Sequence, residues 1–210
     1  CLIPGIMALE SASITIADHH RFGDPGFGRP PADYWGASSL GQICALLGVE
    51  ATPAARLVAA GDHCPGQAYR GECPGVDPEE LMAWRAESRA KFQGRSVEAV
   101  LTDVQRASTA GLEAPPVRIG EIGIADLRGL DVPELPEAAL RGGFAYLAEP
   151  HSTARDPRRK VVVGGAAPDQ EAVCQAFLDH WVPSQGLVDA YGDPARGFAG
   201  AYHPAGSGGW

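Results

Sequence analysis

The stretch that decides the predicted fold is Ser13-Ile14-Thr15-Ile16-Ala17, followed by Asp18-His19-His20 and then by the glycine-rich segment Gly23-Asp24-Pro25-Gly26-Phe27-Gly28. The alternating, β-branched run predicts a buried strand, and the glycines predict that it ends at the edge of a sheet, where parallel sheets bind their ligands. Burying one carboxylate and two imidazoles without partners is unfavourable, whereas a divalent cation would satisfy all three. The sequence therefore predicts a metal site here. The alternative is a strand that enters solvent through polar residues.

The composition is that of a globular protein with one large or two small domains: 210 residues, 45% hydrophobic and 20% charged. No apolar stretch approaches the roughly 20 residues that span a bilayer, and the first residues lack the features of a signal peptide. We therefore expect a cytoplasmic protein without a membrane partner. The net charge of -9 and the pI near 5.1 argue against a broad nucleic-acid surface but allow a small phosphorylated ligand.

The five cysteines are odd in number and scattered along the chain, which argues against a disulfide framework and fits a reducing compartment. Cys64 and Cys73 each begin a Cys-Pro-Gly turn and could share a metal with His63. Zinc and iron–sulfur sites usually contain two close Cys/His pairs, and the absence of a second pair from the sequence disfavours this reading.

Two predicted helices place further polar groups near the candidate site. Ala37-Ser38-Ser39 precedes apolar residues at helical spacing, so the serines are expected at a helix N-terminus, either as an anion cradle or as an ordinary cap. A second helix over Pro53 to Ala60 is expected to end at Gly61-Asp62-His63. This second pairing of a carboxylate with an imidazole favours a metal site, although both residues could be surface caps.

The rest of the chain predicts a helical hairpin and a second α/β unit. The hairpin lies between Asp77 and Gly111, and Ala114-Pro115-Pro116 marks a linker, so we expect domains at residues 1–112 and 113–210. In the second domain, strands alternate with helices. The predicted strands cover residues 117–119, 121–125, 144–148, 160–163 and 187–191, and the predicted helices cover 134–141 and 169–181.

The predicted fold class is therefore α/β: a parallel-sheet N-terminal domain with an inserted helical hairpin and a smaller C-terminal α/β domain. Near the end of the chain, the stretch from Tyr191 to Tyr202 is interpreted as a glycine-punctuated loop after a strand. Its Arg196 could bind a phosphate or carboxylate, with Gly197 and Gly200 beside it. The alternative is that these glycines only serve turns.

Taken together, these features resemble the DHH phosphoesterase superfamily. The resemblance rests on Asp18-His19-His20, the glycine loop, Ala37-Ser38-Ser39, Asp62 after the next helix and a separate C-terminal α/β domain, and it covers most of the chain. The family's two earlier aspartate motifs would precede Asp18 and are not visible, so we expect a chain that is incomplete at its N-terminus, Cys1. The family's C-terminal Gly-Gly-His signature has only a degenerate counterpart, without histidine, at residues 197–201.

The resemblance implies two metal ions, usually Mn²⁺ with Mg²⁺ or another divalent ion possible, that activate a water for attack on phosphorus. It makes His19 and Asp62 metal ligands, Asp18 a ligand or an orienting group, and His20 a contact to the scissile phosphate. The expected function is hydrolysis of a phosphodiester or pyrophosphate bond in a small phosphorylated or short nucleotide substrate. The expected substrate-binding residues are Ser38, Ser39, Arg196, Gly197 and Gly200.

Two other functions remain open from the sequence. One is a catalytically inactive DHH-like module with a binding or regulatory role. The other is a mononuclear zinc or iron hydrolase or lyase that uses His19, His20 and either Asp62 or His63, because two imidazoles and a carboxylate are a common catalytic set.

Overall fold

The computed structural model describes residues 14–150 and 157–205, and the chain divides into two compact units, Cys1–Leu81 and Met82–Trp210. The division lies in the first turn of helix α5 (Pro78–Gln93), earlier in the chain than the boundary near Glu113 that the sequence suggests. The proline-containing segment after helix α6 (Val97–Glu113) leads directly into a strand of the second unit. The proline-containing segment that suggested a domain linker is therefore the connection between α6 and the strand that follows it.

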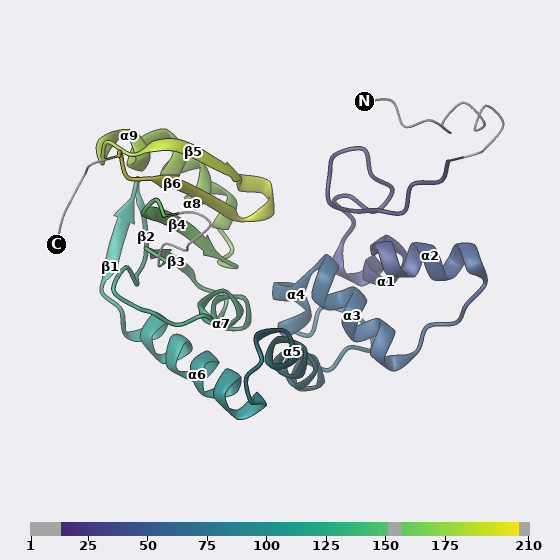
Figure 1. The fold of residues 1–210 in the computed structure, drawn as a ribbon. Helices are drawn as coiled ribbons and strands as arrows, with labels where there is room; N and C mark the ends of the chain where they lie inside the picture. The colour runs from purple at the N-terminus through teal and green to yellow at the C-terminus, as the bar shows by residue number, and fades with distance from the viewer. Residues whose placement is uncertain (1–13, 151–156, 206–210) are drawn as a thin grey trace. The chain divides into compact units, whose positions relative to one another are not determined.

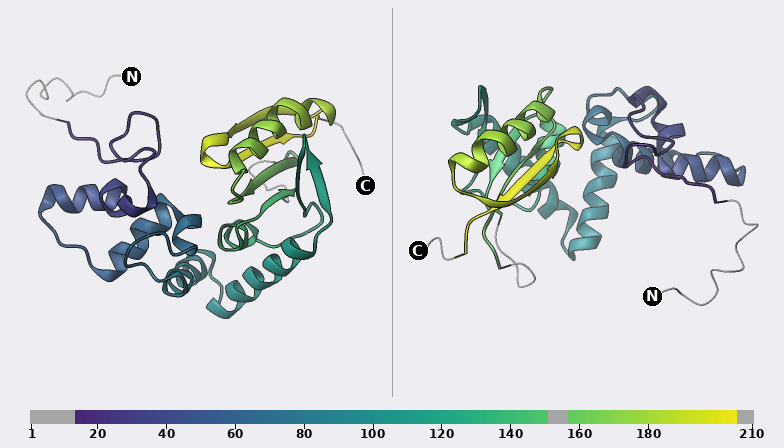
Figure 2. Two further views of the ribbon diagram at one scale, coloured as in Figure 1. Left: turned by 180° about the vertical axis from the view of Figure 1, so that it is seen from behind. Right: turned by 90° about the horizontal axis from the view of Figure 1, so that it is seen from above.

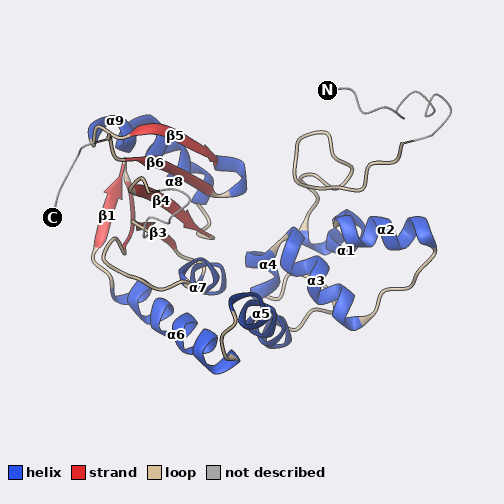
Figure 3. Ribbon diagram, viewed as in Figure 1, coloured by secondary structure: helices blue, strands red, loops and turns tan. Residues whose placement is uncertain are grey.

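The described part of the first unit contains helices and loops (Figure 1 and Figure 3). The prediction of a strand over residues 13–17 is wrong for its described part, because residues 14–17 have no regular secondary structure, and Ile14 and Ile16 are exposed. A strand needs a hydrogen-bonded neighbour, and residues 14–81 contain no strand that could pair with it. The predicted parallel sheet is thus not found in these residues. The unit contains η2 (Pro31–Asp33), α1 (Tyr34–Ala37), α2 (Ser39–Leu47), α3 (Pro53–His63) and α4 (Pro65–Tyr69).

Local caps define the helices of the first unit as the sequence suggests. The Ser38 side chain accepts a hydrogen bond from the Gly41 N–H at the start of α2, and Gly48 ends that helix in the left-handed conformation. Thr52 caps α3 in the same way as Ser38. The helices pack through small or aromatic residues, and the buried Tyr34 donates a hydrogen bond to the Pro74 carbonyl at 3.3 Å. The loop with the candidate site lies against this helical scaffold.

The second unit is built on a six-stranded mixed sheet, and the α/β class is confirmed at this level. Only β2 and β3 are parallel, joined by the crossover helix α7 (Leu135–Gly142), and the remaining neighbours are antiparallel. The strands run in the order β1-β2-β3-β4-β6-β5. They are β1 (Pro116–Ile119), β2 (Ile122–Asp126), β3 (Ala145–Ala148), β4 (Lys160–Gly165), β5 (Val188–Asp193) and β6 (Phe198–Tyr202).

Alternate residues of the strands form the core of the second unit. Leu147, Val161 and Val163 point to one face, where they pack with Val173 of α8 (Gln170–Ala176) and with Phe177. Phe177 begins the π-helical segment η3 (Phe177–Trp181), which continues into α9 (Val182–Ser184), and these helices lie along the sheet (Figure 2). Within residues 14–150 and 157–205, no helix combines the length and apolar character needed to cross a membrane.

The interpretation of residues 191–202 as a loop is wrong, because they form most of a β-hairpin. The short helix η4 (Pro194–Arg196) turns the chain between β5 and β6, and β6 lies inside the sheet between β4 and β5. Gly200 pairs with Tyr191, and a Cβ on this glycine would lie 2.5 Å from the tyrosine ring. The glycines that suggested a loop therefore permit close packing across a strand pair.

Candidate metal centre

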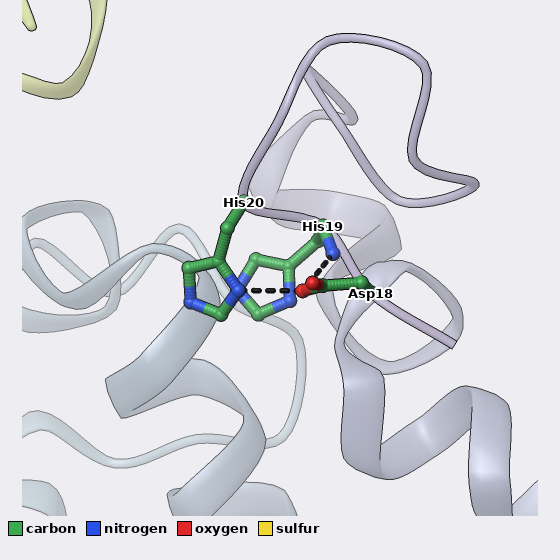
Figure 4. A group of neighbouring side chains, drawn as sticks. All are labelled: Asp18, His19 and His20. Carbon is green, nitrogen blue, oxygen red and sulfur yellow. Dashed lines mark hydrogen bonds and ion pairs between the residues drawn. The ribbon is translucent and has the colours of Figure 1, made fainter. Parts of the chain in front are cut away.

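The segment Asp18-His19-His20 is held on the first unit by hydrogen bonds to its backbone rather than by a sheet. The Asp18 carbonyl accepts hydrogen bonds from the Gly26 N–H and from the Gln42 side chain of α2, both at 3.1 Å. The same Gln42 amide nitrogen donates to the Ala37 carbonyl at 2.6 Å. These contacts connect the start of the glycine loop to the junction of α1 and α2, which positions the three side chains in Figure 4.

Gly26 is required by this arrangement because the backbone passes too close for a side chain. A Cβ at this position would lie 1.9 Å from the Ala37 carbonyl oxygen and 2.7 Å from the His19 Cβ. The first distance is far inside van der Waals contact, so an alanine would push the loop away from α1 and from His19. Gly26 of the glycine-rich segment therefore allows this segment to pack against α1 and His19.

Asp18 acts on its two neighbours through one carboxylate oxygen. Its Oδ1 accepts the His19 backbone N–H at 2.7 Å and lies 2.6 Å from the His20 Nδ1 (Figure 4). The hydrogen bond from the His20 side chain is the main reason that the pKa of Asp18 falls to about 2. The ionised carboxylate therefore holds the His20 ring by its Nδ1 and leaves the other ring nitrogen available.

His19 is buried, with only 5% of its side chain exposed. Its Nδ1 lies 3.1 Å from the Ser39 hydroxyl, and that hydroxyl lies 3.4 Å from the Asp18 Oδ1. The His19 Nε2, by contrast, is buried without a hydrogen-bond partner. Burial, followed by the proximity of His20, lowers the pKa of His19, so its imidazole is neutral near pH 7. A neutral imidazole is the form that binds a metal.

The free nitrogens of both imidazoles face the same carboxylate, at the C-terminal end of α3. The His19 Nε2 lies 3.7 Å from the Asp62 Oδ2, and the His20 Nε2 lies 3.8 Å from the Asp62 Oδ1. The two imidazole rings are 4.0 Å apart, and the His63 ring meets His19 edge-on at 5.0 Å. The structure therefore brings together the four residues Asp18, His19, His20 and Asp62 that the sequence selected.

A cation shared by His19, His20 and Asp62 would require these side chains to move inward, because the two imidazoles face different oxygens of Asp62. Ligand atoms that are each about 2.0–2.2 Å from one tetrahedral metal ion lie roughly 3.3–3.6 Å from one another. The separations between the two Nε2 atoms and the Asp62 oxygens are slightly longer than this. The buried, unpartnered His19 Nε2 is the atom for which a cation would supply the missing interaction. The residue types at this site, two histidines and an aspartate, are ones that can hold a divalent metal ion.

A second way to hold a cation uses Asp18 together with both imidazoles, whose potential ligand atoms all lie within 4.8 Å of one another. In the part of the chain that the structure describes, this is the one such group of three histidine, cysteine or acidic residues. By the same measure, neither the set of His19, His20 and Asp62 nor the alternative set of His63, Cys64 and Cys73 forms such a group. The Asp18 Oδ1 already accepts a hydrogen bond from the His20 Nδ1 at 2.6 Å, a contact that is typical of an orienting group.

The two serines have different positions and different roles. The Ser38 hydroxyl is fully buried, donates to the Trp35 carbonyl at 3.1 Å and accepts from the Gly41 N–H at 3.0 Å. It therefore has the ordinary capping role that the sequence left open, and its geometry offers no exposed hydroxyl to a phosphate. Ser39 instead contacts His19 and Asp18, and these contacts were missed because sequence spacing cannot show which side chain a helix N-terminus meets.

The remaining predicted substrate residues belong to the hairpin of the second unit. The Arg196 guanidinium lies 5.8 Å from the centre of the Phe198 ring, and the Gly197 carbonyl accepts a hydrogen bond from the Gln170 side chain at 3.0 Å. Gly200 lies within β6. Local packing accounts for the two glycines, and their predicted contact with substrate, like that of Arg196, stays a prediction.

Comparison with known proteins finds no family model, no curated protein and no solved structure that matches this chain.

Proposed function

We propose that the chain is a metal-dependent phosphoesterase that hydrolyses a phosphodiester or pyrophosphate bond of a small nucleotide-type substrate. The observation that carries the proposal is the convergence of the His19 and His20 Nε2 atoms on the Asp62 carboxylate at 3.7 and 3.8 Å. The resemblance of the motifs to the DHH phosphoesterase superfamily supports the reaction class. The metal site itself is supported by the chemistry of the side chains.

The chain's own residues prepare both imidazoles for binding. The Ser39 N–H lies 3.3 Å from the His19 Nδ1 and donates to it when His19 carries its proton on Nε2. When both imidazoles carry their proton on Nδ1, His20 donates to Asp18, and His19 donates to the Ser39 hydroxyl, which in turn can donate to Asp18. Both Nε2 lone pairs then point toward Asp62 and are free to bind a cation. Because His20 has the same relation to Asp62 as His19 has, the proposal makes His20 a ligand rather than a contact to the phosphate. A divalent cation at this point would lower the pKa of a water and neutralise charge on the phosphate oxygens.

A second candidate is a mononuclear zinc or iron hydrolase or lyase. The observation that favours it is the donor set, because two imidazoles and one carboxylate suffice for one ion. Metal content separates the two candidates: one ion per chain supports the mononuclear enzyme, and two support the phosphoesterase that the resemblance implies. Bound metal without hydrolysis of any phosphoester would favour the inactive binding module.

The test compares Asp62→Asn with Asp33→Asn in the full chain. Asp33 is an exposed aspartate of the same unit that forms only a 3.6 Å surface pair with Arg29, so its substitution removes an equal charge away from the imidazoles. We expect Asp62→Asn to lose bound Mn²⁺ or Zn²⁺ and the hydrolysis of pyrophosphate and short dinucleotides, and Asp33→Asn to keep both. Hydrolysis by Asp62→Asn at the unsubstituted rate would refute the proposed site.

A further inference from the structure

A second group of reactive side chains in the first unit consists of Cys64 and Cys73. Their sulfur atoms lie 3.1 Å apart, and the two residues are only 6% and 1% exposed. Both are free thiols in the structure. The pair takes no part in the candidate metal centre, so its close approach needs a separate explanation.

The backbone on both sides holds the two sulfurs in this position. The Cys64 N–H donates to the Ala60 carbonyl at the end of α3, and the Cys64 carbonyl accepts the Ala68 N–H in α4. Across from it, the Cys73 carbonyl accepts the Val76 N–H in a turn in which Gly75 has a φ of 73°. Because both backbones are already hydrogen-bonded, the sulfurs meet without any segment having to fold or move first.

We propose that Cys64 and Cys73 are a modification site at which a small hydroperoxide converts the two thiols into a reversible disulfide. The sulfurs must approach one another by about 1 Å to reach a disulfide length of about 2.05 Å, which side-chain rotation can supply. The small exposed area of both residues favours a small oxidant over a bulky protein disulfide. This inference is independent of the proposed phosphoesterase activity.

The chemistry balances with hydrogen peroxide as the oxidant. The Cys73 thiolate attacks a peroxide oxygen, which breaks the O–O bond, forms a sulfenic acid and releases hydroxide that takes up the thiol proton as water. The Cys64 sulfur then attacks the sulfenic sulfur, forming the S–S bond and releasing the sulfenic oxygen as a second water. Two thiols are oxidised and one peroxide is reduced to two waters. The hydrogen bond from Cys64 lowers the pKa of Cys73, which favours Cys73 as the attacking group.

The geometry distinguishes this pair from the other buried thiol of the described chain. Cys174 accepts a hydrogen bond from the Gln170 side chain at 3.4 Å and lies in the core of the second unit. It has an amide rather than a second sulfur as its partner, so it cannot close a disulfide in place. Cys174→Ser is therefore a matched control for the loss of one buried thiol.

The test uses the reduced full chain, treated with hydrogen peroxide, blocked with an alkylating reagent and digested with trypsin. Trypsin cleaves after Arg56, Arg70 and Arg85, so Cys64 and Cys73 fall on separate peptides, residues 57–70 and 71–85. We expect these two peptides to appear joined in most chains, to separate on treatment with dithiothreitol, and to remain joined in oxidised Cys174→Ser. We expect the joined peptide to be lost in Cys64→Ser.

The peroxide experiment on the unsubstituted chain can refute the proposal without any variant. Separate peptides that remain alkylated at both cysteines would show that the pair does not react. Sulfinic or sulfonic acid on either peptide, or a link from Cys64 to a cysteine other than Cys73, would show that the two sulfurs do not combine in the way proposed.

Discussion

Ser39→Ala is expected to weaken cation binding without weakening the fold. The substitution removes the hydroxyl that lies 3.1 Å from the His19 Nδ1 and 3.4 Å from the Asp18 Oδ1. The Ser39 N–H remains 3.3 Å from the same Nδ1 and would then favour the tautomer that carries its proton on Nε2. Because that proton occupies the metal-binding nitrogen, the imidazole must change its tautomer before it can bind.

The size of the effect follows from the role of Ser39 as an orienting partner. Loss of such a partner typically costs 10–100-fold in metal affinity. A cation at a free concentration of 100 times its Kd stabilises the native chain by about 2.7 kcal/mol. At the same concentration this gain falls to about 1.4 kcal/mol after a 10-fold loss of affinity and to about 0.4 kcal/mol after a 100-fold loss. The assay is urea unfolding of the first unit, followed with and without Zn²⁺ or Mn²⁺.

Ser38→Ala is the matched control because it removes the adjacent hydroxyl, which caps α2 and contacts neither imidazole. We expect it to lower the free energy of unfolding without metal by about 1 kcal/mol, while the metal-dependent gain stays unchanged. Ser39→Ala should show the opposite pattern. Equal metal-dependent gains in both variants and in the unsubstituted chain would refute the orienting role of Ser39.

Three further substitutions test other parts of the structure. Gly26→Ala places a Cβ 1.9 Å from the Ala37 carbonyl oxygen. We expect the free energy of unfolding in urea to fall by about 1–3 kcal/mol and cation binding to weaken. A metal-dependent gain equal to that of the unsubstituted chain would contradict the close approach. Arg85→Met removes both 2.6 Å hydrogen bonds to the buried Glu137 carboxylate. We expect this substitution to lower the free energy of unfolding by about 3–5 kcal/mol. A loss under about 1 kcal/mol would show that the pair is solvated. Burial raises the pKa of Tyr146 to about 12, while the unfolded value is near 10, so the folded state favours the neutral phenol. We therefore expect stability to fall by about 1.9 kcal/mol as pH rises from 10 to 12. Tyr146→Phe should remove this dependence, and an unchanged pH profile in that variant would assign it to another group.

Much of the local structure was predictable because it depends on neighbours in the sequence. The two helices predicted between Asp77 and Gly111 are confirmed as α5 and α6, with Asp77 accepting the N–H groups of the first turn of α5, Gly94 in the left-handed conformation and Ser96 capping α6. The two helices do not pack closely against each other, so the predicted hairpin is not found. The first five strands of the second unit also lie close to their predicted positions. The strand β6 was missed because glycines in a sequence usually indicate a turn. The structure shows that Gly200 instead makes room for the Tyr191 ring on the neighbouring strand.

The strand predicted before Asp18 shows the limit of pattern alone. Alternation of apolar residues indicates which face would be buried, but it cannot supply the neighbouring strand that must accept the hydrogen bonds. In the described first unit that neighbour is absent, and Ile16 is 62% exposed. The Asp18 backbone is held instead by Gln42 and Gly26, two contacts without a pattern in the sequence.

The amino-acid sequence alone determined which groups are chemically suited to a cation, because the residue types Asp, His, His and Asp carry their ligand atoms wherever they lie. Only the tertiary structure decided that α3 ends where the Asp62 carboxylate faces both Nε2 atoms, and that Ser39 rather than Ser38 contacts His19. Convergence depends on how helices distant in the chain pack, and packing is set by the combined volumes and contacts of many side chains rather than by any single motif.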